Sequence, residues 1–139
     1  MAEITLKNNG LYKQDIKSIL NLNCNFFELK EKTILITGAT GLIGSVLVDM
    51  LVFLSNTYKL DLNLLLMSRT AESRSEKFEG TFIQHIKCDV SNEKLTEKIP
   101  LDKKIDFIFH LASNTHPADY SKYPIETIIT NFNGTKGLL

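Results

Sequence analysis

The stretch T-I-L-I-T-G-A-T-G-L-I-G, residues 33–44, constrains the fold of this chain more than any other. An apolar run of strand length leads into Gly38, Gly41 and Gly44, and the apolar residues that follow recur at helical spacing. Each glycine costs roughly 0.5–1 kcal/mol relative to alanine inside a helix or strand, which indicates a specific use. A turn without Cβ atoms lets the backbone approach a pyrophosphate, and the first N–H groups of the helix supply donors. The stretch therefore predicts a dinucleotide-binding turn, with a purely structural tight turn as the alternative.

From residue 33 onward, apolar runs of strand length alternate with helical periodicity, which predicts an α/β fold with a parallel sheet. The expected strands are residues 33–37, 62–67, 81–87 and 105–111. A helix from about residue 41 separates the first two strands, and another begins at Pro124 and continues to the last residue. The polar segments 71–78 and 91–99 are expected to form short helices or turns.

The composition excludes several classes of partner. The 16 Lys and Arg residues balance the 16 Asp and Glu residues, so no net field attracts nucleic acid or an anionic membrane. The chain starts without an apolar secretory core, and no apolar run approaches the ~20 residues of a membrane span, so we expect a cytoplasmic protein. Cys24 and Cys88 are expected to be reduced thiols. No metal is expected, because His110 and His116 lack the helical spacing of metal ligands. A nucleoside triphosphate is not expected either, because the glycine turn lacks the G-K-[ST] that would bind the phosphates and magnesium.

Four motifs, in order, resemble those of the short-chain dehydrogenase/reductase superfamily. T-G-A-T-G-L-I-G, with its G-x-x-G-x-x-G spacing, is similar to the glycine motif of that superfamily. C-D-V at 88–90 is similar to the segment whose aspartate and following apolar residue hold the adenine ring. H-L-A-S-N-T-H at 110–116 and T-N-F-N-G-T at 130–135 resemble motifs of the extended branch, the nucleotide-sugar epimerases and dehydratases. The resemblance covers residues 31–139. It implies the N-terminal part of an NAD(P)-binding Rossmann-type domain, a doubly wound parallel sheet with the four expected strands in the order 3-2-1-4.

Residues 1–30 lie outside this resemblance. They are polar and rich in asparagine, with one weakly amphipathic segment, L-Y-K-Q-D-I-K-S-I-L, at residues 11–20. We expect a partly helical N-terminal extension that packs on the domain, with a partner-binding arm as the alternative.

The resemblance also implies which residues bind the cofactor. The pyrophosphate would lie on the glycine turn and the start of its helix, at Gly38, Thr40, Gly41, Leu42 and Ile43. The adenine would lie at Asp89 and Val90, and the far half of the cofactor at Leu111, Ala112, Ser113 and Thr130. His116 would fall near the sugar-nucleotide side. On the residues alone, each also has a structural alternative. Asp89 could cap a following helix, His110 could be a hydrogen-bonded core residue, and His116 could be a loop residue without a role in binding.

The end of the second expected strand departs from the usual pattern, because it reads Met-Ser-Arg-Thr at 67–70 and has no acidic residue. A carboxylate there would accept the ribose hydroxyls of NAD, whereas Ser68 and Arg69 suit the 2′-phosphate of NADP. Asp61 precedes the strand and so falls at the opposite edge of the sheet. We therefore expect NAD(P) binding with NADP favoured over NAD, a solvated loop arginine being the alternative.

The catalytic pair of the resembled family is missing from this sequence. The family uses a tyrosine with a lysine four residues on, but Tyr120 is followed at that distance by Pro124, and Tyr123 by Thr127. No catalytic residue is therefore assigned. We expect a cofactor-binding part of a longer enzyme that oxidises a nucleotide sugar transiently by hydride transfer. The alternative is a natural short NAD(P)-binding module without catalysis. Because no strand is expected to cover 105–111, we also expect a homo-oligomer.

Overall fold

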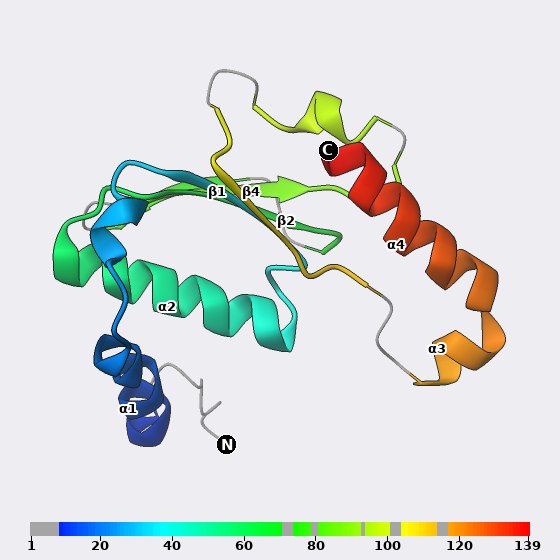
Figure 1. Ribbon diagram of the computed structural model, residues 1–139. Coiled ribbons are helices and arrows are strands. Elements are labelled where there is room, and N and C mark those ends of the chain that lie inside the picture. The colour runs from blue at the N-terminus through cyan, green and yellow to red at the C-terminus, as the bar shows by residue number, and fades with distance from the viewer. Residues whose placement is uncertain (1–8, 71–73, 79–80, 93, 101–103, 114–116) are drawn as a thin grey trace.

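A five-stranded sheet forms the centre of this computed structural model, which describes residues 9–70, 74–78, 81–92, 94–100, 104–113 and 117–139 (Figure 1). The strands are β1 (Thr33–Thr37), β2 (Asn63–Ser68), β3 (Arg74–Phe78), β4 (Thr81–Lys87) and β5 (Phe107–His110). They lie in the order β3-β4-β2-β1-β5.

The four strands expected from the sequence, now β1, β2, β4 and β5, lie side by side in the predicted order, and every pairing among them is parallel. The prediction of a doubly wound parallel sheet is confirmed. β1 and β4 have the predicted bounds, β2 lies one residue later, and β5 is shorter at both ends. Thr37 at the end of β1 pairs with Met67 of β2 and His110 of β5, so these strands end at one edge. The turn after β1 leaves this edge where the strand order reverses.

β3 is a strand that the sequence reasoning missed. The expectation of a short helix or turn over 71–78 is wrong for residues 74–78, which pair antiparallel with β4, while residues 71–73 lie outside the described residues. Phe78 pairs with Thr81, and only two residues separate them in the sequence. Such a short connection joins antiparallel strands, whereas a parallel crossover needs a dozen residues or so.

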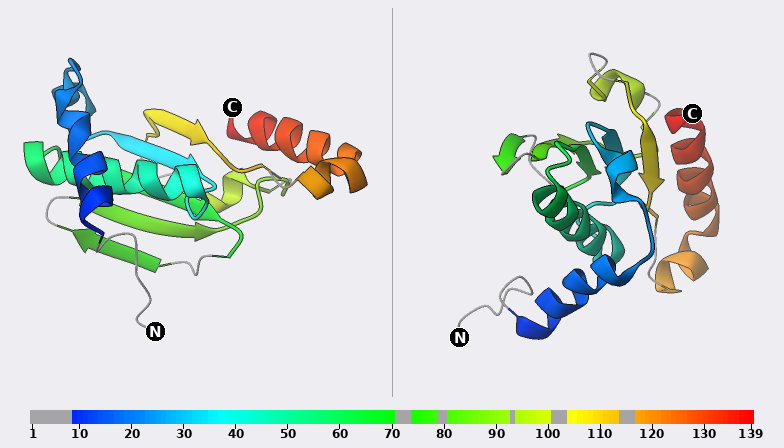
Figure 2. Two further views of the ribbon diagram at one scale, coloured as in Figure 1. Left: turned by 90° about the horizontal axis from the view of Figure 1, so that it is seen from below. Right: turned by 60° about the vertical axis from the view of Figure 1, so that its left-hand side comes forward.

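Helices cover both faces of the sheet (Figures 1 and 2). The helical elements are α1 (Gly10–Ser18), α2 (Leu42–Tyr58), α3 (Pro117–Lys122), α4 (Pro124–Leu138) and the 3₁₀ turns η2 (Ile19–Asn21), η3 (Phe26–Leu29) and η4 (Thr96–Lys98). On one face, Leu51 and Leu54 of α2 pack with Ile34 and Ile36 of β1. On the other face, Leu95, Ile99 and the end of α4 pack with Leu35, Leu65 and Met67. The side chains of Ile34 and Ile36 therefore pack on one face of the sheet and that of Leu35 on the other, as expected for a strand buried on both faces.

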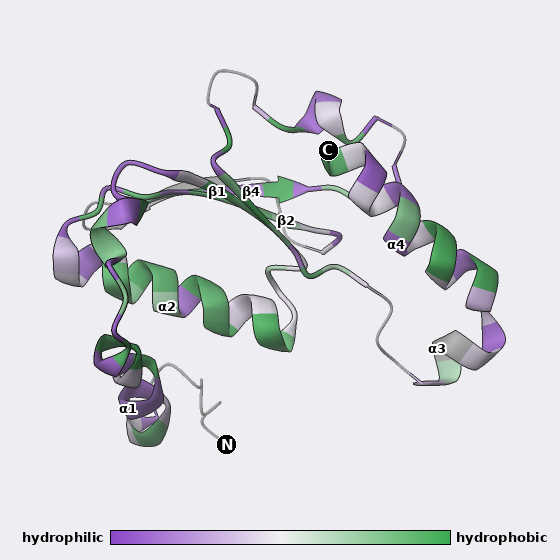
Figure 3. Ribbon diagram, in the orientation of Figure 1, coloured by the Kyte–Doolittle hydropathy of each residue, from purple (hydrophilic) through white to green (hydrophobic). Residues whose placement is uncertain are grey.

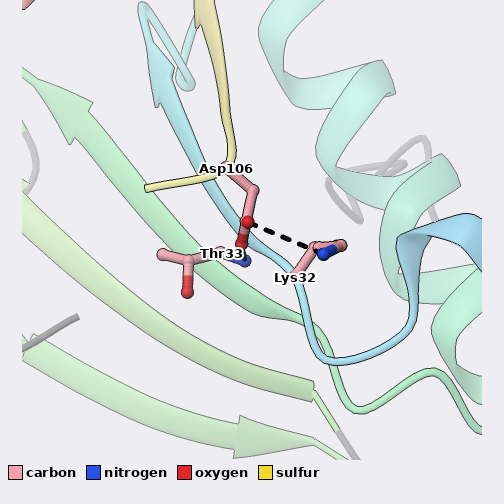
Figure 4. Close-up of polar contacts among 3 residues, drawn as sticks. All are labelled: Lys32, Thr33 and Asp106. Carbon is pink, nitrogen blue, oxygen red and sulfur yellow. Dashed lines mark hydrogen bonds and ion pairs between the residues drawn. The ribbon is translucent and has the colours of Figure 1, made fainter. Parts of the chain in front are cut away.

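The start of β5 is fixed to the start of β1 by Asp106 (Figure 4). Its Oδ2 accepts a hydrogen bond of 3.0 Å from the Thr33 N–H, and its Oδ1 lies 3.7 Å from Lys32 Nζ. The Asp106 N–H in turn donates to the Thr33 carbonyl at 2.9 Å. The backbone hydrogen bond from Thr33, followed by the charges of Lys32 and Lys104, lowers the pKa of the Asp106 carboxyl despite its partial desolvation. These contacts fix the register of β5 against β1 and thereby the position of the residues that follow β5.

The N-terminal region contributes α1, which packs on α2. Asn9 caps α1, accepting from the N–H groups of Leu11 and Tyr12. The Tyr12 hydroxyl donates to Asp49 Oδ2 of α2 at 2.8 Å, and burial together with this bond raises the pKa of Tyr12 to about 12. The boundary at residue 30 and a role as an arm stay predictions.

Apolar side chains are exposed along β5 and along α4. β5 is an edge strand, and Phe107, Ile108 and Phe109 are 39–43% exposed. On α4, Ile125, Ile128, Ile129 and Phe132 recur at helical spacing and are 47–67% exposed. Figure 3 shows the hydrophobic segments of α4 in green. None of the helices in the described ranges has the length and apolar character that crossing a bilayer requires.

Candidate dinucleotide site

The turn after β1 depends on a glycine at residue 38. Gly38 has a φ of +69°, a region in which side chains other than glycine are strained. A Cβ there would lie 2.8 Å from the Ala112 N, in the segment that follows β5. The Gly38 N–H donates to the Met67 carbonyl at 2.9 Å, which ties the turn to the end of β2. The turn therefore brings the backbones that follow β1 and β5 closer together than any side chain would allow.

α2 starts directly on this turn. Gly41 is its N-cap and offers no side-chain hydrogen bond, so the first N–H groups of α2 are available to a ligand. Gly44 is buried one turn later, where a Cβ would overlap the Gly38 carbonyl oxygen and lie 2.9 Å from the Ala39 Cα. The absence of a side chain at Gly44 thus allows the helix start, with its positive dipole end, to lie against the loop.

A pocket of about 380 Å³ opens at this edge of the sheet. The residues from which we expect cofactor contacts all line it: Gly38, Thr40, Gly41, Leu42, Ile43, Ser68, Arg69, Asp89, Val90, Leu111, Ala112, Ser113 and Thr130. They come from the segments that follow β1, β4 and β5, from the end of β2, from the start of α2 and from α4, so the fold assembles them in one place. Their role in binding stays a prediction. Gly44, Met67, Thr70 and Cys88 also line the pocket and were not predicted, although each adjoins a predicted position. His116 lies outside the described residues.

Apolar side chains flank the glycine turn. Leu42 and Ile43 are 79% and 70% exposed at the start of α2, whereas the neighbouring Ala39 is buried. Val90, across the pocket, is also buried. Exposed aliphatic residues beside free helix N–H groups match a ligand that has both a charged group and flat apolar parts.

Asp89 follows β4 and has a double role in the local structure. Its Oδ1 accepts from the Ser91 N–H at 2.9 Å and from the Ser91 hydroxyl at 2.8 Å, which closes a short turn. Although partial burial acts to raise the pKa of Asp89, the two hydrogen bonds from Ser91 and the charge of Arg69 lower it overall. The carboxyl is therefore ionised at neutral pH. Both bonds end on Oδ1, so within the described part of the chain Oδ2 is left to accept from a ligand.

The residues at the end of β2 differ in accessibility. Ser68 is 7% exposed and pairs in the sheet with Lys87, whereas Arg69 is exposed on the pocket side. The guanidinium is near enough to Asp89 to affect its pKa. Of the two residues, Arg69 is the one that can reach a phosphate in solvent.

Thr37 and His110 join the ends of β1 and β5. Thr37 Oγ1 lies 2.7 Å from His110 Nδ1 and accepts at 3.2 Å from the N–H groups of Leu111 and Ala112. Sequence reasoning did not name Thr37, although it occupies the position before the first glycine. On the other side of the ring, a Cβ at Gly134 of α4 would lie 3.0 Å from His110 Nε2. The glycine in T-N-F-N-G-T therefore permits α4 to pack against His110.

The described residues offer little basis for metal binding or cysteine chemistry. No cluster of three or more His, Cys, Asp or Glu residues there could hold a metal ion. Cys24 is exposed and Cys88 is buried, and neither forms a disulfide. Burial and the charge of Asp89 raise the pKa of the Cys88 thiol.

The doubly wound sheet with a glycine turn at its switch point defines a Rossmann-type nucleotide-binding domain. The chain belongs to the NAD dependent epimerase/dehydratase family, whose model matches residues 34–139. It is 32% identical over 117 residues to UDP-glucuronic acid decarboxylase 6 of Arabidopsis thaliana, across 84% of this chain and 32% of that protein. The chain thus spans about a third of the length of this relative. The resemblance seen in the sequence motifs is confirmed.

Two solved structures share the fold. L-threonine dehydrogenase of Clostridium difficile has a TM-score of 0.53 and 31% identity, across 78% of this chain and 32% of that one. A short chain dehydrogenase from Leptospira borgpetersenii, solved with bound NAD+, has a TM-score of 0.58 across 84% of this chain and 47% of that one. At 23% identity, the second likeness concerns the fold alone.

Proposed function

We propose that the pocket binds NAD(P) and that the chain is the cofactor-binding part of an enzyme that acts on a nucleotide sugar. The observation that carries this proposal is the pocket itself, in which a glycine turn, an open helix start and the ends of parallel strands converge. Membership of the NAD dependent epimerase/dehydratase family supports the cofactor. The name of the Arabidopsis relative supports a nucleotide sugar as substrate. NAD(P) would supply a hydride acceptor for transient oxidation of the sugar.

Each side of the pocket has a separate task in this proposal. The N–H groups that start α2 donate to the pyrophosphate, as the N-termini of helices commonly do for phosphates. Asp89 Oδ2 accepts from the exocyclic amine of adenine, and Val90 packs on the ring. Leu111, Ala112, Ser113 and Thr130 lie along the half that carries the nicotinamide. His116 stays a proposal for the sugar side.

Arg69 is proposed to favour NADP over NAD by pairing with the 2′-phosphate. Its exposure at the pocket and the missing carboxylate at the end of β2 support this assignment. A charge-assisted hydrogen bond is worth about 1.5–3 kcal/mol, or roughly a tenfold or greater effect. Arg69→Ala should weaken NADPH binding by about that factor and leave NADH binding within about twofold. An unchanged NADPH affinity would remove Arg69 from the site.

The central test is a titration of the 139-residue chain with NADH and NADPH, followed by nucleotide fluorescence, for wild type and Asp89→Asn. Asparagine keeps one oxygen for Ser91 and replaces the other with an amide NH₂, which cannot accept from adenine. We expect about tenfold weaker binding of both nucleotides. Asp61→Asn is the matched control, because Asp61 is exposed, precedes β2 at the opposite edge and has a φ of 52° that asparagine tolerates. Equal affinities for all three proteins, or no binding by wild type, would refute the proposed site.

The second candidate, a short binding module without catalysis, is favoured by the missing Y-x-x-x-K in the 139 residues. Both candidates predict dinucleotide binding, so binding does not separate them. The reading frame beyond the codon for Leu139 does. A Y-x-x-x-K in frame supports the enzyme, and a stop codon supports the module.

We also propose self-association. The exposed apolar residues of β5 offer unpaired backbone groups, and the stripe on α4 offers an apolar helix face. The cytoplasmic location stays a prediction.

A further inference from the structure

His110 ends β5 beside the dinucleotide pocket without lining it. Its ring lies between two elements, with Nδ1 2.7 Å from Thr37 Oγ1 of β1 and the Nε2 side against Gly134 of α4. Thr37 Oγ1 also contacts the N–H groups of Leu111 and Ala112, which belong to the pocket wall. One hydroxyl therefore connects the imidazole to the wall.

The hydrogen-bond inventory of Thr37 determines which imidazole nitrogen carries the proton. A threonine hydroxyl has one proton to donate and two lone pairs to accept with. The Ala112 N–H donates to Thr37 Oγ1, and the Leu111 N–H is shared at 3.2 Å between Thr37 Oγ1 and the Thr37 carbonyl oxygen. Because both N–H groups approach the hydroxyl oxygen, its lone pairs are engaged, and the hydroxyl proton is left to be donated to His110 Nδ1. A neutral imidazole that accepts at Nδ1 carries its proton on Nε2.

We propose that His110, as the neutral Nε2–H tautomer, is a positioning residue of the dinucleotide site. By accepting the Thr37 proton, it keeps the hydroxyl lone pairs directed at the Leu111 and Ala112 N–H groups. That arrangement holds the backbone of the pocket wall against Gly38, where the approach is so close that a Cβ would lie 2.8 Å from the Ala112 N. Because α4 rests on the same ring through Gly134, the position of Thr130 in the pocket depends on His110 as well. The consequence for binding rests on the proposed function, whereas the tautomer and the wall geometry do not.

Protonation of His110 would disrupt this arrangement. The imidazolium presents N–H donors at both nitrogens, so Nδ1 would become a third donor facing the two lone pairs of Thr37. Thr37 of β1 and Gly134 of α4, which lie against the ring, are uncharged, and so is Val90, which lies beside Gly134. Burial lowers the pKa of His110 below its ordinary value of 6.5, and no charged group of the described residues shifts it. The order of the wall should therefore be complete above about pH 6.5 and be lost as the pH falls through the lower pKa of the folded state.

The tautomer can be measured without any ligand. Long-range ¹H–¹⁵N correlation spectra of the imidazole rings separate the Nε2–H from the Nδ1–H form, and His110→Phe assigns its signals among the three histidines. We expect the Nε2–H form for His110 at pH 8. In the same samples, His110→Phe and Thr37→Val should speed hydrogen exchange of the Ala112 amide by about tenfold. The Leu111 amide should change less, because it also donates to the Thr37 carbonyl at 3.2 Å. Exchange in the centre of β2 should change less, which separates a local effect from loss of global stability.

Conservative variants complete the test. In His110→Asn, the side-chain oxygen takes the place of Nδ1 as acceptor, and Thr37→Ser keeps the hydroxyl, so both should restore slow exchange. They should also bind NADH within about twofold of wild type, whereas His110→Phe binds about tenfold more weakly. His85→Phe is the matched control, since His85 lies on β4 outside the pocket lining. An Nδ1–H tautomer, or unchanged exchange at Ala112 in His110→Phe, would overturn the proposal. Normal NMR results with no NADH binding by wild type would instead refute the proposed function alone.

Discussion

Gly44→Ala should be one of the more damaging single-methyl additions in this chain. The new Cβ would overlap the Gly38 carbonyl oxygen and lie 2.9 Å from the Ala39 Cα, and both are backbone atoms that cannot rotate away. α2 would have to move off the turn. Overpacking costs about 1–3 kcal/mol, and contact with backbone on two sides places this site near the upper end. Alanine returns about 1 kcal/mol of helix propensity, so the expected net loss is about 2 kcal/mol in the free energy of unfolding.

Gly10→Ala is the matched control for the same chemical change. Gly10 begins α1, and a Cβ there has nothing within 4 Å. Alanine at Gly10 should therefore be neutral or slightly stabilising. Gly134→Ala should fall between the two, because its new Cβ would meet the His110 ring, a side chain, at 3.0 Å.

Urea unfolding followed by circular dichroism would rank the three variants. With a slope of about 2 kcal/mol per molar urea, a loss of about 2 kcal/mol lowers the midpoint for Gly44→Ala by about 1 M. NADH binding should weaken as well, because the helix start that is proposed to donate to the pyrophosphate would move. A Gly44→Ala midpoint equal to that of Gly10→Ala would show that the turn is not packed as closely as the structure indicates, and the account of the glycine spacing would fail.

Three other predictions follow from the structure. Asp106→Asn keeps an acceptor for the Thr33 N–H but removes the charge, so it should lose less stability than wild type when the pH falls from about 6 to about 3. The reason is that a carboxyl whose pKa is lowered by folding stabilises the fold only while it is ionised. Thermal unfolding at each pH measures this, with Asp61→Asn as the control, and a parallel pH dependence of wild type and Asp106→Asn would contradict it. Residues 1–139 should convert no UDP-glucuronic acid in the presence of NAD or NADP, and measurable product by chromatography would show that catalysis does not need Y-x-x-x-K. Sedimentation velocity over a roughly hundredfold concentration range should show self-association. The double variant Ile128→Glu and Phe132→Glu, on the exposed face of α4, should weaken that association. A single monomeric species at all concentrations of wild type would contradict the proposed self-association.

The sequence was most informative where local chemistry and long-range packing impose the same pattern. β1 and β4 were predicted to the residue. β1 is an apolar run followed by a glycine turn, and in β4 aromatic and β-branched residues, which favour strands, stand among polar ones. β3 was missed because Arg74–Phe78 is polar and gains strand structure only by pairing with β4, a long-range contact that no local pattern encodes. The same limit applies to Thr37, whose role depends on the register between β1 and β5.

The accessibility of the site residues was also beyond sequence reasoning. Ser68 and Arg69 were predicted together as phosphate contacts, yet the end of β2 buries Ser68 and leaves Arg69 exposed. Whether a residue at a strand end faces the core or the pocket depends on where the strand stops, and that boundary shifted by one residue from its expected position. The proposed preference for NADP therefore rests on Arg69 more than on Ser68.

The pocket has two halves that differ in their support from the fold. The half proposed to hold adenine and pyrophosphate rests on β1, β2 and β4, whose residues Ile36, Leu66 and Met67 are at most 4% exposed. Its far half rests on Leu111–Ser113, which follow β5, a strand whose residues Phe107 and Phe109 are 43% and 39% exposed. Local opening costs least where little apolar surface is buried, so the far half should open more readily than the adenine half. Because the backbone N–H groups of the far half depend on Thr37 and His110 for their order, these two residues matter most on the side of the pocket with the fewest other supports.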